Sequence, residues 1–214
     1  MPALIDTLLG RDNAPVVRDK IAEILKLELT RQGELGLSPV PRVFVERSQP
    51  WGAIVESPPR LEPIINVWFD TATFDGGSSN IIERQRCDGT FNIDVYAFAP
   101  SRETVPGHTP ADLAAALSCQ DAIGYARQIL MSAHYVHLGL RGLVWKRWPQ
   151  TIGMFQPAID QRMAQHVVAG RLALGVQFNE FSPQVEGEPL ETLTVEVKRS
   201  ETGEVYLLAE YPSP

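Results

Sequence analysis

Apolar residues recur at helical spacing in two segments of the chain. Val17, Ile21, Ile24, Leu25 and Leu29 lie three or four residues apart, which predicts a helix of about 15–18 residues that begins at Asn13 and ends before Gly33. An alanine-rich segment follows Thr109, the predicted helix cap, and runs to about Ser132. Its predicted apolar face includes Leu113, Leu117, Ile123 and Leu130. The pattern therefore predicts two amphipathic helices.

The other regular segments have the patterns of β-strands. Ile64–Phe69 is apolar without alternation, which is typical of a strand buried on both faces. Thr90–Ala99 alternates between apolar and polar residues and predicts a half-buried strand. Further strands are predicted at Arg42–Glu46, Leu143–Trp148 and Val168–Asn179. The second of these is expected to end at Pro149, before a loop that contains Gly153 and Met154. A last hairpin is predicted from Leu193–Val197 and Val205–Ala209.

The order of these elements predicts an α+β fold. We expect a mostly antiparallel β-sheet with two α-helices packed on it, plus a C-terminal β-hairpin, in a single domain over residues 1–214. Long loops are expected at about 37–63, where six prolines fall, and at about 70–87, where Asp75–Asn80 has turn composition. A loop of the second kind is usually functional or disordered.

Charge and cysteine usage narrow the classes of function. The 19 Lys+Arg against 26 Asp+Glu give a formal charge of −7, and there is no cationic run for tight non-specific DNA binding. Cys87 and Cys119 are expected to be free thiols of a reducing compartment; a disulfide stays open, whereas a metal site lacks further ligands at suitable spacing. Neither a signal peptide nor a membrane span is expected, so we expect assembly in the cytoplasm.

Candidate catalytic groups do not form a complete set. His134 and His137 are three residues apart, without nearby acidic or thiol ligands, and are expected to decorate the end of a helix. Asp88 and Asp94 could be two carboxylates of one site, but Asp94 falls on the polar side of a predicted strand, so solvated carboxylates are expected. We therefore expect no enzyme, no catalytic residues, no cofactor and no metal.

The remaining sequence features fit a protein–protein interface better than a catalytic site. The loop at 70–87 has a glycine–serine centre but apolar flanks, and such a segment can order against a partner. Trp145 and Trp148 are an odd number of residues apart on a presumed strand, so at least one is expected to face away from the main core. The candidate subunit or partner interface comprises Phe74, Ile81, Ile82, Glu83, Arg84, Arg86, Trp145 and Trp148.

The order and texture of the elements resemble the tail terminator and tail-completion (neck) proteins of long-tailed bacteriophages. The similarity covers roughly residues 14–210 and lies in Pro63–Trp68, Glu83–Arg86, Phe91–Ala97, Ala126–Leu130 and Leu138–Leu140, in that order after a helix. It lies in element order and not in an invariant motif.

The resemblance implies a structural virion protein that forms a hexameric ring. Such a ring caps the tail tube, stops its polymerisation and joins the tail to the head-side connector, while DNA passes through without specific binding. The implied partners are copies of itself, the tail tube protein and neck proteins, with no membrane. Two alternatives stay open: another phage neck or head-completion connector, and a non-catalytic ligand-binding domain.

Overall fold

The computed structural model describes residues 9–50, 61–76, 84–104, 107–155, 157, 167–182, 192–198 and 205–212. Residues Leu9–Ser182 form one compact unit, and the C-terminal hairpin belongs to a second unit. The single domain over residues 1–214 stays a prediction.

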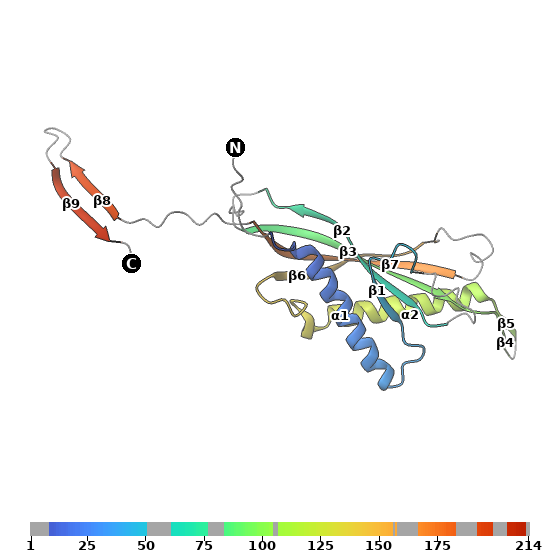
Figure 1. Cartoon of the computed structure of the whole chain (residues 1–214). Coiled ribbons are helices and arrows are strands. Elements are labelled where there is room, and N and C mark those ends of the chain that lie inside the picture. Colours follow the sequence, from blue (N-terminus) through green and yellow to red (C-terminus); the bar gives the residue numbers. More distant parts are fainter. Residues whose placement is uncertain are drawn as a thin grey trace. The chain divides into compact units, whose positions relative to one another are not determined.

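The larger unit is a five-stranded sheet with two helices on one face (Figure 1). The strands lie in the order β1-β2-β3-β7-β6, in which β1 is parallel to β2 and every other pair is antiparallel. Their bounds are β1 Arg42–Val45, β2 Ile64–Phe74, β3 Arg84–Phe98, β6 Val144–Phe155 and β7 Val167–Phe181. The predicted α+β class and mostly antiparallel sheet are confirmed.

Both helices form close to the predicted segments. Helix α1 spans Asn13–Glu34, helix α2 spans Ala111–Met131, and a short 3-10 helix, η2, spans Ala133–Tyr135. Helix α1 continues through Gly33 and ends at Glu34; Gly36, two residues further on, has a φ of 110° that suits glycine. The predicted Thr109 cap is wrong, because Thr109 belongs to β5 and Pro110 precedes α2 without a side-chain cap.

The main core lies between the helices and the sheet. Val17, Ile21 and Leu25 of α1 are buried against Ile65 and Val67 of β2. Helix α2 approaches the sheet with small residues, Ala115, Cys119 and Ala122, while Leu113 and Leu117 are exposed. The prediction that Leu113 and Leu117 lie on the apolar face of α2 is therefore wrong. Alanines face the sheet instead, and they allow closer packing on it than leucines would.

Parts of two predicted loops form β-strands in the structure. The loop expected at 70–87 is wrong over Asp70–Phe74 and Arg84–Cys87, which belong to β2 and β3. Phe74 is paired with Cys87 of β3, and Arg84 is paired with Phe181 of β7. Strand β6 also continues past Pro149 to Phe155 through a β-bulge between Pro149 and Thr151. The bulge accommodates the proline, which explains why the sequence pattern alone ended the strand too early.

The remaining strands form two small sheets. Strands β4 (Arg102–Thr104) and β5 (Gly107–Thr109) pair ahead of α2. Strands β8 (Thr192–Lys198) and β9 (Val205–Pro212) pair as the predicted antiparallel hairpin. Its register places Leu193, Val195 and Val197 opposite Tyr211, Ala209 and Leu207.

Candidate assembly surface

The sheet face away from the helices has an ion pair whose carboxylate is buried. Arg171 of β7 donates two hydrogen bonds to the Asp94 carboxylate, at 2.6 and 2.9 Å, and Trp68 Nε1 donates a third at 2.9 Å. The guanidinium lies over the rings of Trp68 and Phe155, 4.9 and 5.4 Å from their centroids. Hydrogen bonding to Asp94 raises the pKa of Arg171.

The expected solvation of the polar side of β3 is wrong at two positions. Asp94 is 3% exposed and Asn92 is 2% exposed, whereas Asp88 is exposed and accepts a hydrogen bond from Gln177. Asp94 is buried because Trp68 and Arg171 lie over it. Burial also raises the pKa of the neighbouring Tyr96 hydroxyl. Trp68, Asp94 and Arg171 are thus paired across three neighbouring strands, whereas the buried Asn92 side-chain nitrogen has no hydrogen-bond partner among the described residues.

Trp148 also lies on this face. A Cβ atom at Gly175 would come within 2.7 Å of Trp148 Nε1, so the indole rests directly on the glycine backbone. The prediction that at least one of the two tryptophans faces away from the main core is thus confirmed for Trp148. Trp145 lies in a second register shift of β6, between Val144 and Lys146, and is 47% exposed.

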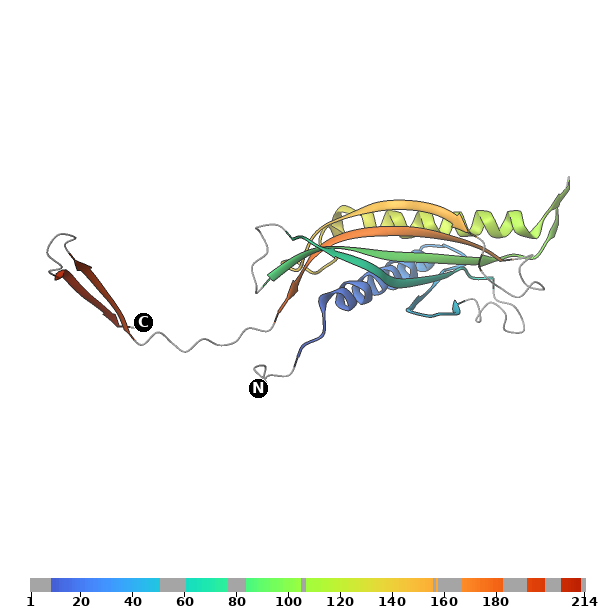
Figure 2. The same ribbon diagram turned by 90° about the horizontal axis from the view of Figure 1, so that it is seen from above.

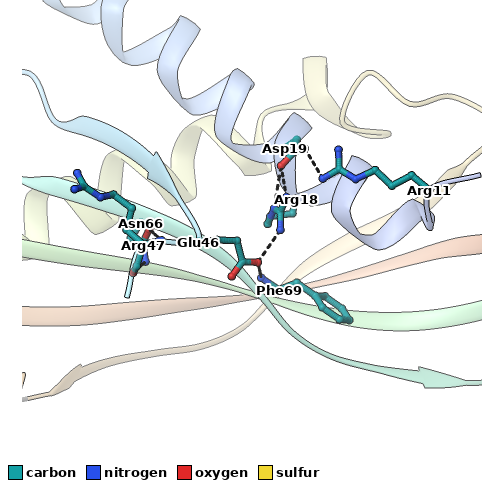
Figure 3. A network of polar contacts seen from close by, with 7 residues as sticks. All are labelled: Arg11, Arg18, Asp19, Glu46, Arg47, Asn66 and Phe69. Carbon is teal, nitrogen blue, oxygen red and sulfur yellow. Dashed lines mark hydrogen bonds and ion pairs between the residues drawn. The ribbon is translucent and has the colours of Figure 1, made fainter. Parts of the chain in front are cut away.

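Figure 3 shows how polar contacts fix β1 to α1 and β2. The Glu46 carboxylate accepts hydrogen bonds from Arg18 of α1, at 2.8 Å, and from the backbone N–H of Phe69, at 3.1 Å. Arg18 also pairs with Asp19, which Arg11 contacts at 3.0 Å. These contacts fix the position of the short edge strand.

The Asn66 side chain extends this network at the end of β1. Asn66 accepts a hydrogen bond from the Arg47 backbone N–H and donates one to the Arg47 carbonyl, at 3.1 and 3.0 Å. The paired contacts hold the chain against β2 directly after Val45, the last residue of β1.

The other edge strand, β6, presents apolar residues to solvent. In Figure 2 it forms the sheet edge beside α2. Its last five residues, Thr151–Phe155, contain no charged residue and no proline, and we call them the β6 edge segment. Within this segment Ile152 is 53% and Met154 is 43% exposed. Natural edges are usually protected by charge, proline or bulges. Lys146, Pro149 and the bulge after Pro149 protect the first part of β6, whereas the β6 edge segment beyond them has no charge or proline and is suited to pairing with another strand.

The predicted interface residues do not gather at one place. Phe74 is exposed at the end of β2, and Arg84 and Arg86 are exposed at the start of β3, across the β2–β3 pair. Ile81, Ile82 and Glu83 lie outside the described residues. Trp145 and Trp148 belong to β6. Sequence reasoning missed Ile152 and Met154, although their alternation with Thr151 and Gly153 was a usable strand signal.

The thiols and histidines have structural surroundings. Cys87 and Cys119 are free and buried, and burial raises the pKa of each thiol to about 12. The His134 ring is edge-on to Tyr135, and His137 Nδ1 lies 3.0 Å from the Val144 carbonyl oxygen. Within the described residues, no three His, Cys, Asp or Glu side chains are grouped as metal ligands, and no helix is long and apolar enough to cross a membrane.

Carbonyl groups at the C-terminal end of α2 accept hydrogen bonds from an arginine of another element. Arg147 of β6 donates hydrogen bonds to the Leu130 and Ser132 carbonyl oxygens. A guanidinium is favoured here because a helix C-terminus has unpaired carbonyls and partial negative charge. Desolvation lowers the pKa of Arg147. The contact anchors β6 to α2 and leaves its last residues at the edge.

Comparison with known proteins yields no assignment: no protein-family model and no curated protein matches the chain.

Proposed function

We propose that this protein is a structural virion component, a ring-forming tail terminator that caps the tail tube, stops its polymerisation and joins the tail to the head-side connector. The α+β architecture supports the proposal, because the resemblance implies a sheet with two helices against it. The proposal rests chiefly on the β6 edge segment, since an uncharged strand edge with half-exposed Ile152 and Met154 is suited to binding another polypeptide.

The charge of the chain is consistent with a conduit for DNA. Six copies at −7 each give a formal −42 for the ring. A ring through which DNA slides should repel phosphates, since each unpaired cation that binds a phosphate would retard passage. We therefore expect no salt-sensitive, sub-micromolar affinity for duplex DNA. Such an affinity would contradict the proposal.

The mass of the protein in solution, alone and with tail tubes, tests the proposal. A hexamer of 23.7 kDa subunits has a mass of about 142 kDa, which light scattering after size-exclusion chromatography resolves from a monomer. The ring should bind the ends of purified tail tubes and block their extension by added tube protein, as measured by electron microscopy. A monomer that ignores tubes would refute the proposal, and a ring that binds only the head-side connector would favour the neck-connector alternative.

A further inference from the structure

Only alternate residues of strand β1 direct their backbone N–H and C=O groups to its outer edge, away from β2. Arg42 N–H donates to the Pro63 carbonyl and Glu46 N–H donates to the Val67 carbonyl, so the backbone groups of these two residues face β2. Successive residues of a strand direct their backbone groups to alternate edges. Val43 and Val45 therefore direct theirs outward, and within the described residues no strand lies beyond them.

The same alternation can be followed across the sheet to the other edge. Odd-numbered residues of β2 face β1, so its even-numbered residues, such as Asn66, pair with Asp94 of β3. The odd-numbered residues of β3 then pair with even-numbered residues of β7, as Ile93 does with Leu172. Arg171 therefore faces Gly153 of β6. The outward backbone groups of the β6 edge segment are those of Ile152 and Met154.

The outer edges of β1 and β6 also match in strand direction and in the sheet face to which their apolar side chains point. Counted across the sheet, β6 runs antiparallel to β1. Met154 lies on the helix side, because its sulfur and Ile123 of α2 both approach Gly170, and Ile152 shares that face. Val43 packs against the helix-side core, and Val45 shares its face.

A hollow of about 710 Å³ lies beside β1 on this same side. Lys26 and Thr30 of α1 line it together with Val40 and Val43. The charged residues Arg42 and Glu62 also line it. Side chains of a strand added outside β1 would lie within reach of this hollow, because cross-strand neighbours lie about 5 Å apart.

We propose that the β6 edge segment of one copy pairs antiparallel with β1 of a second copy, with Ile152 opposite Val45 and Met154 opposite Val43. In this register Gly153 lies opposite Phe44 on the other face, and a Cβ at Gly153 would meet nothing within 4 Å. All four β1 residues are then paired, and the helices of both copies lie on the same side. The sheet continues head to tail, and such a heterologous interface closes into a ring when the rotation per subunit allows it.

This inference deepens the proposed function by naming the contact between subunits, and it rests on the ring part of that function. The alternative, a two-fold pairing of β6 with β6, would satisfy that edge but leave both β1 edges and their hollows uncovered. It makes a different prediction for cross-linking, so the two can be separated.

Cross-linking between variants that each carry one added surface cysteine tests the pairing. Ile152→Cys and Val45→Cys change exposed side chains, 53% and 36% accessible, so both variants should fold. The native thiols are buried with raised pKa values of about 12 and should not compete. Opposed residues of an antiparallel pair have Cα atoms about 5.5 Å apart, which is within disulfide range. Within one chain, positions 45 and 152 lie about 19 Å apart, four strand spacings, so any cross-link between them joins two copies.

Mixing the two variants under oxidation should give covalent dimers on a non-reducing gel, and the double variant should give a ladder up to the ring. Gly153→Cys mixed with Val45→Cys is the matched control, since its thiol lies one residue away on the opposite face and should cross-link at least about fivefold less. Dimers from Ile152→Cys alone would overturn the proposal in favour of two-fold pairing. Absence of mixed dimers, or equal yield in the control, would overturn it outright.

The outcomes separate this inference from the proposed function because cross-linking needs no tail tubes. A ring of hexamer mass that does not cross-link refutes the β6–β1 pairing alone. A protein that forms the ladder but does not stop tube extension refutes the terminator function alone.

Discussion

Arg171 and Asp94 form a two-point ion pair on the sheet face away from the helices, with N···O distances of 2.6 and 2.9 Å. The Asp94 side chain is 5% exposed, whereas that of Arg171 is 38% exposed. The carboxylate is therefore the buried partner, and the arginine is the group that compensates its charge.

Replacing Arg171 should destabilise the fold strongly. Arg171→Leu leaves the Asp94 carboxylate buried without its cation, and we expect the free energy of unfolding to fall by about 3 kcal/mol. Urea denaturation followed by tryptophan fluorescence measures the change. The double variant Asp94→Asn/Arg171→Leu should lose less than Arg171→Leu alone, because no unpaired charge remains. A double variant as unstable as the sum of the single changes would contradict this account.

A second carboxylate, on β7, caps helix α1. The two Glu180 carboxylate oxygens lie 2.8 Å from the backbone nitrogens of Asn13 and Ala14. These are among the N–H groups that a helix leaves unpaired, and Asp12 provides no side-chain cap. Glu180→Ala should therefore lower the free energy of unfolding by about 1–2 kcal/mol. Glu180→Gln, which keeps one acceptor, should lose about half as much, and hydrogen exchange should accelerate in the first turn of α1 in Glu180→Ala only. Equal exchange in both variants would argue against the cap.

How much of the structure the sequence predicts depends on how far apart along the chain the interacting residues lie. The α1 stripe and the long strand β7 follow from local periodicity and are confirmed. The Glu180 cap joins residues 166 and 167 positions apart, and no local pattern encodes it. Asn92 and Asp94 alternate like solvated residues, yet both are buried, and Trp68 and Arg171 bind the Asp94 carboxylate.

The candidate interface was predictable only in part, for the same reason. Local composition at Trp145 and Trp148 pointed to β6, but Pro149 ended the predicted strand before Ile152 and Met154. Only the pairing of β6 with β7 shows that the strand passes the proline through a bulge. The outward positions of both edges depend on strand order, which hydrophobic alternation does not specify.

The contact between Trp148 and Gly175 predicts a steric cost. Gly175→Ala would place a Cβ within 2.7 Å of the indole nitrogen, so the ring must move. We expect a loss of about 1–3 kcal/mol in the free energy of unfolding and a shift in tryptophan emission. Gly153→Ala, with open space around its Cβ, is the matched control on β6 and should change neither quantity appreciably. An unchanged spectrum for Gly175→Ala would show that Trp148 does not rest on this glycine.

The buried thiols predict both slow labelling and loss of stability at high pH. Since burial raises the pKa values of Cys87 and Cys119 to about 12 from an ordinary 9.0, the folded protein keeps protons that the unfolded chain releases. Their contribution to stability is complete below pH 9 and decreases as the pH rises from about 9 to 12. Maleimide at pH 8 should react with the folded protein at least about 100-fold more slowly than with the urea-unfolded chain. Rapid labelling of the native protein would contradict the observed burial.

The β6 edge segment predicts a specific response to added charge. Ile152→Lys places an ammonium group on an apolar edge that we propose to be covered by a second copy, and a lysine there is a common natural block to strand addition. Leu117→Lys is the matched control: Leu117 on α2 has the same exposed fraction, 53%, and the substitution adds the same charge. We expect Ile152→Lys to weaken subunit association by at least about 30-fold, since a buried interface anchor is worth about 2 kcal/mol or more, while Leu117→Lys leaves it within about twofold. Sedimentation velocity over a concentration series measures both, and thermal unfolding checks that each variant is folded. Equal weakening by the two lysines would mean that the effect is one of net charge and that the β6 edge does not join the subunits.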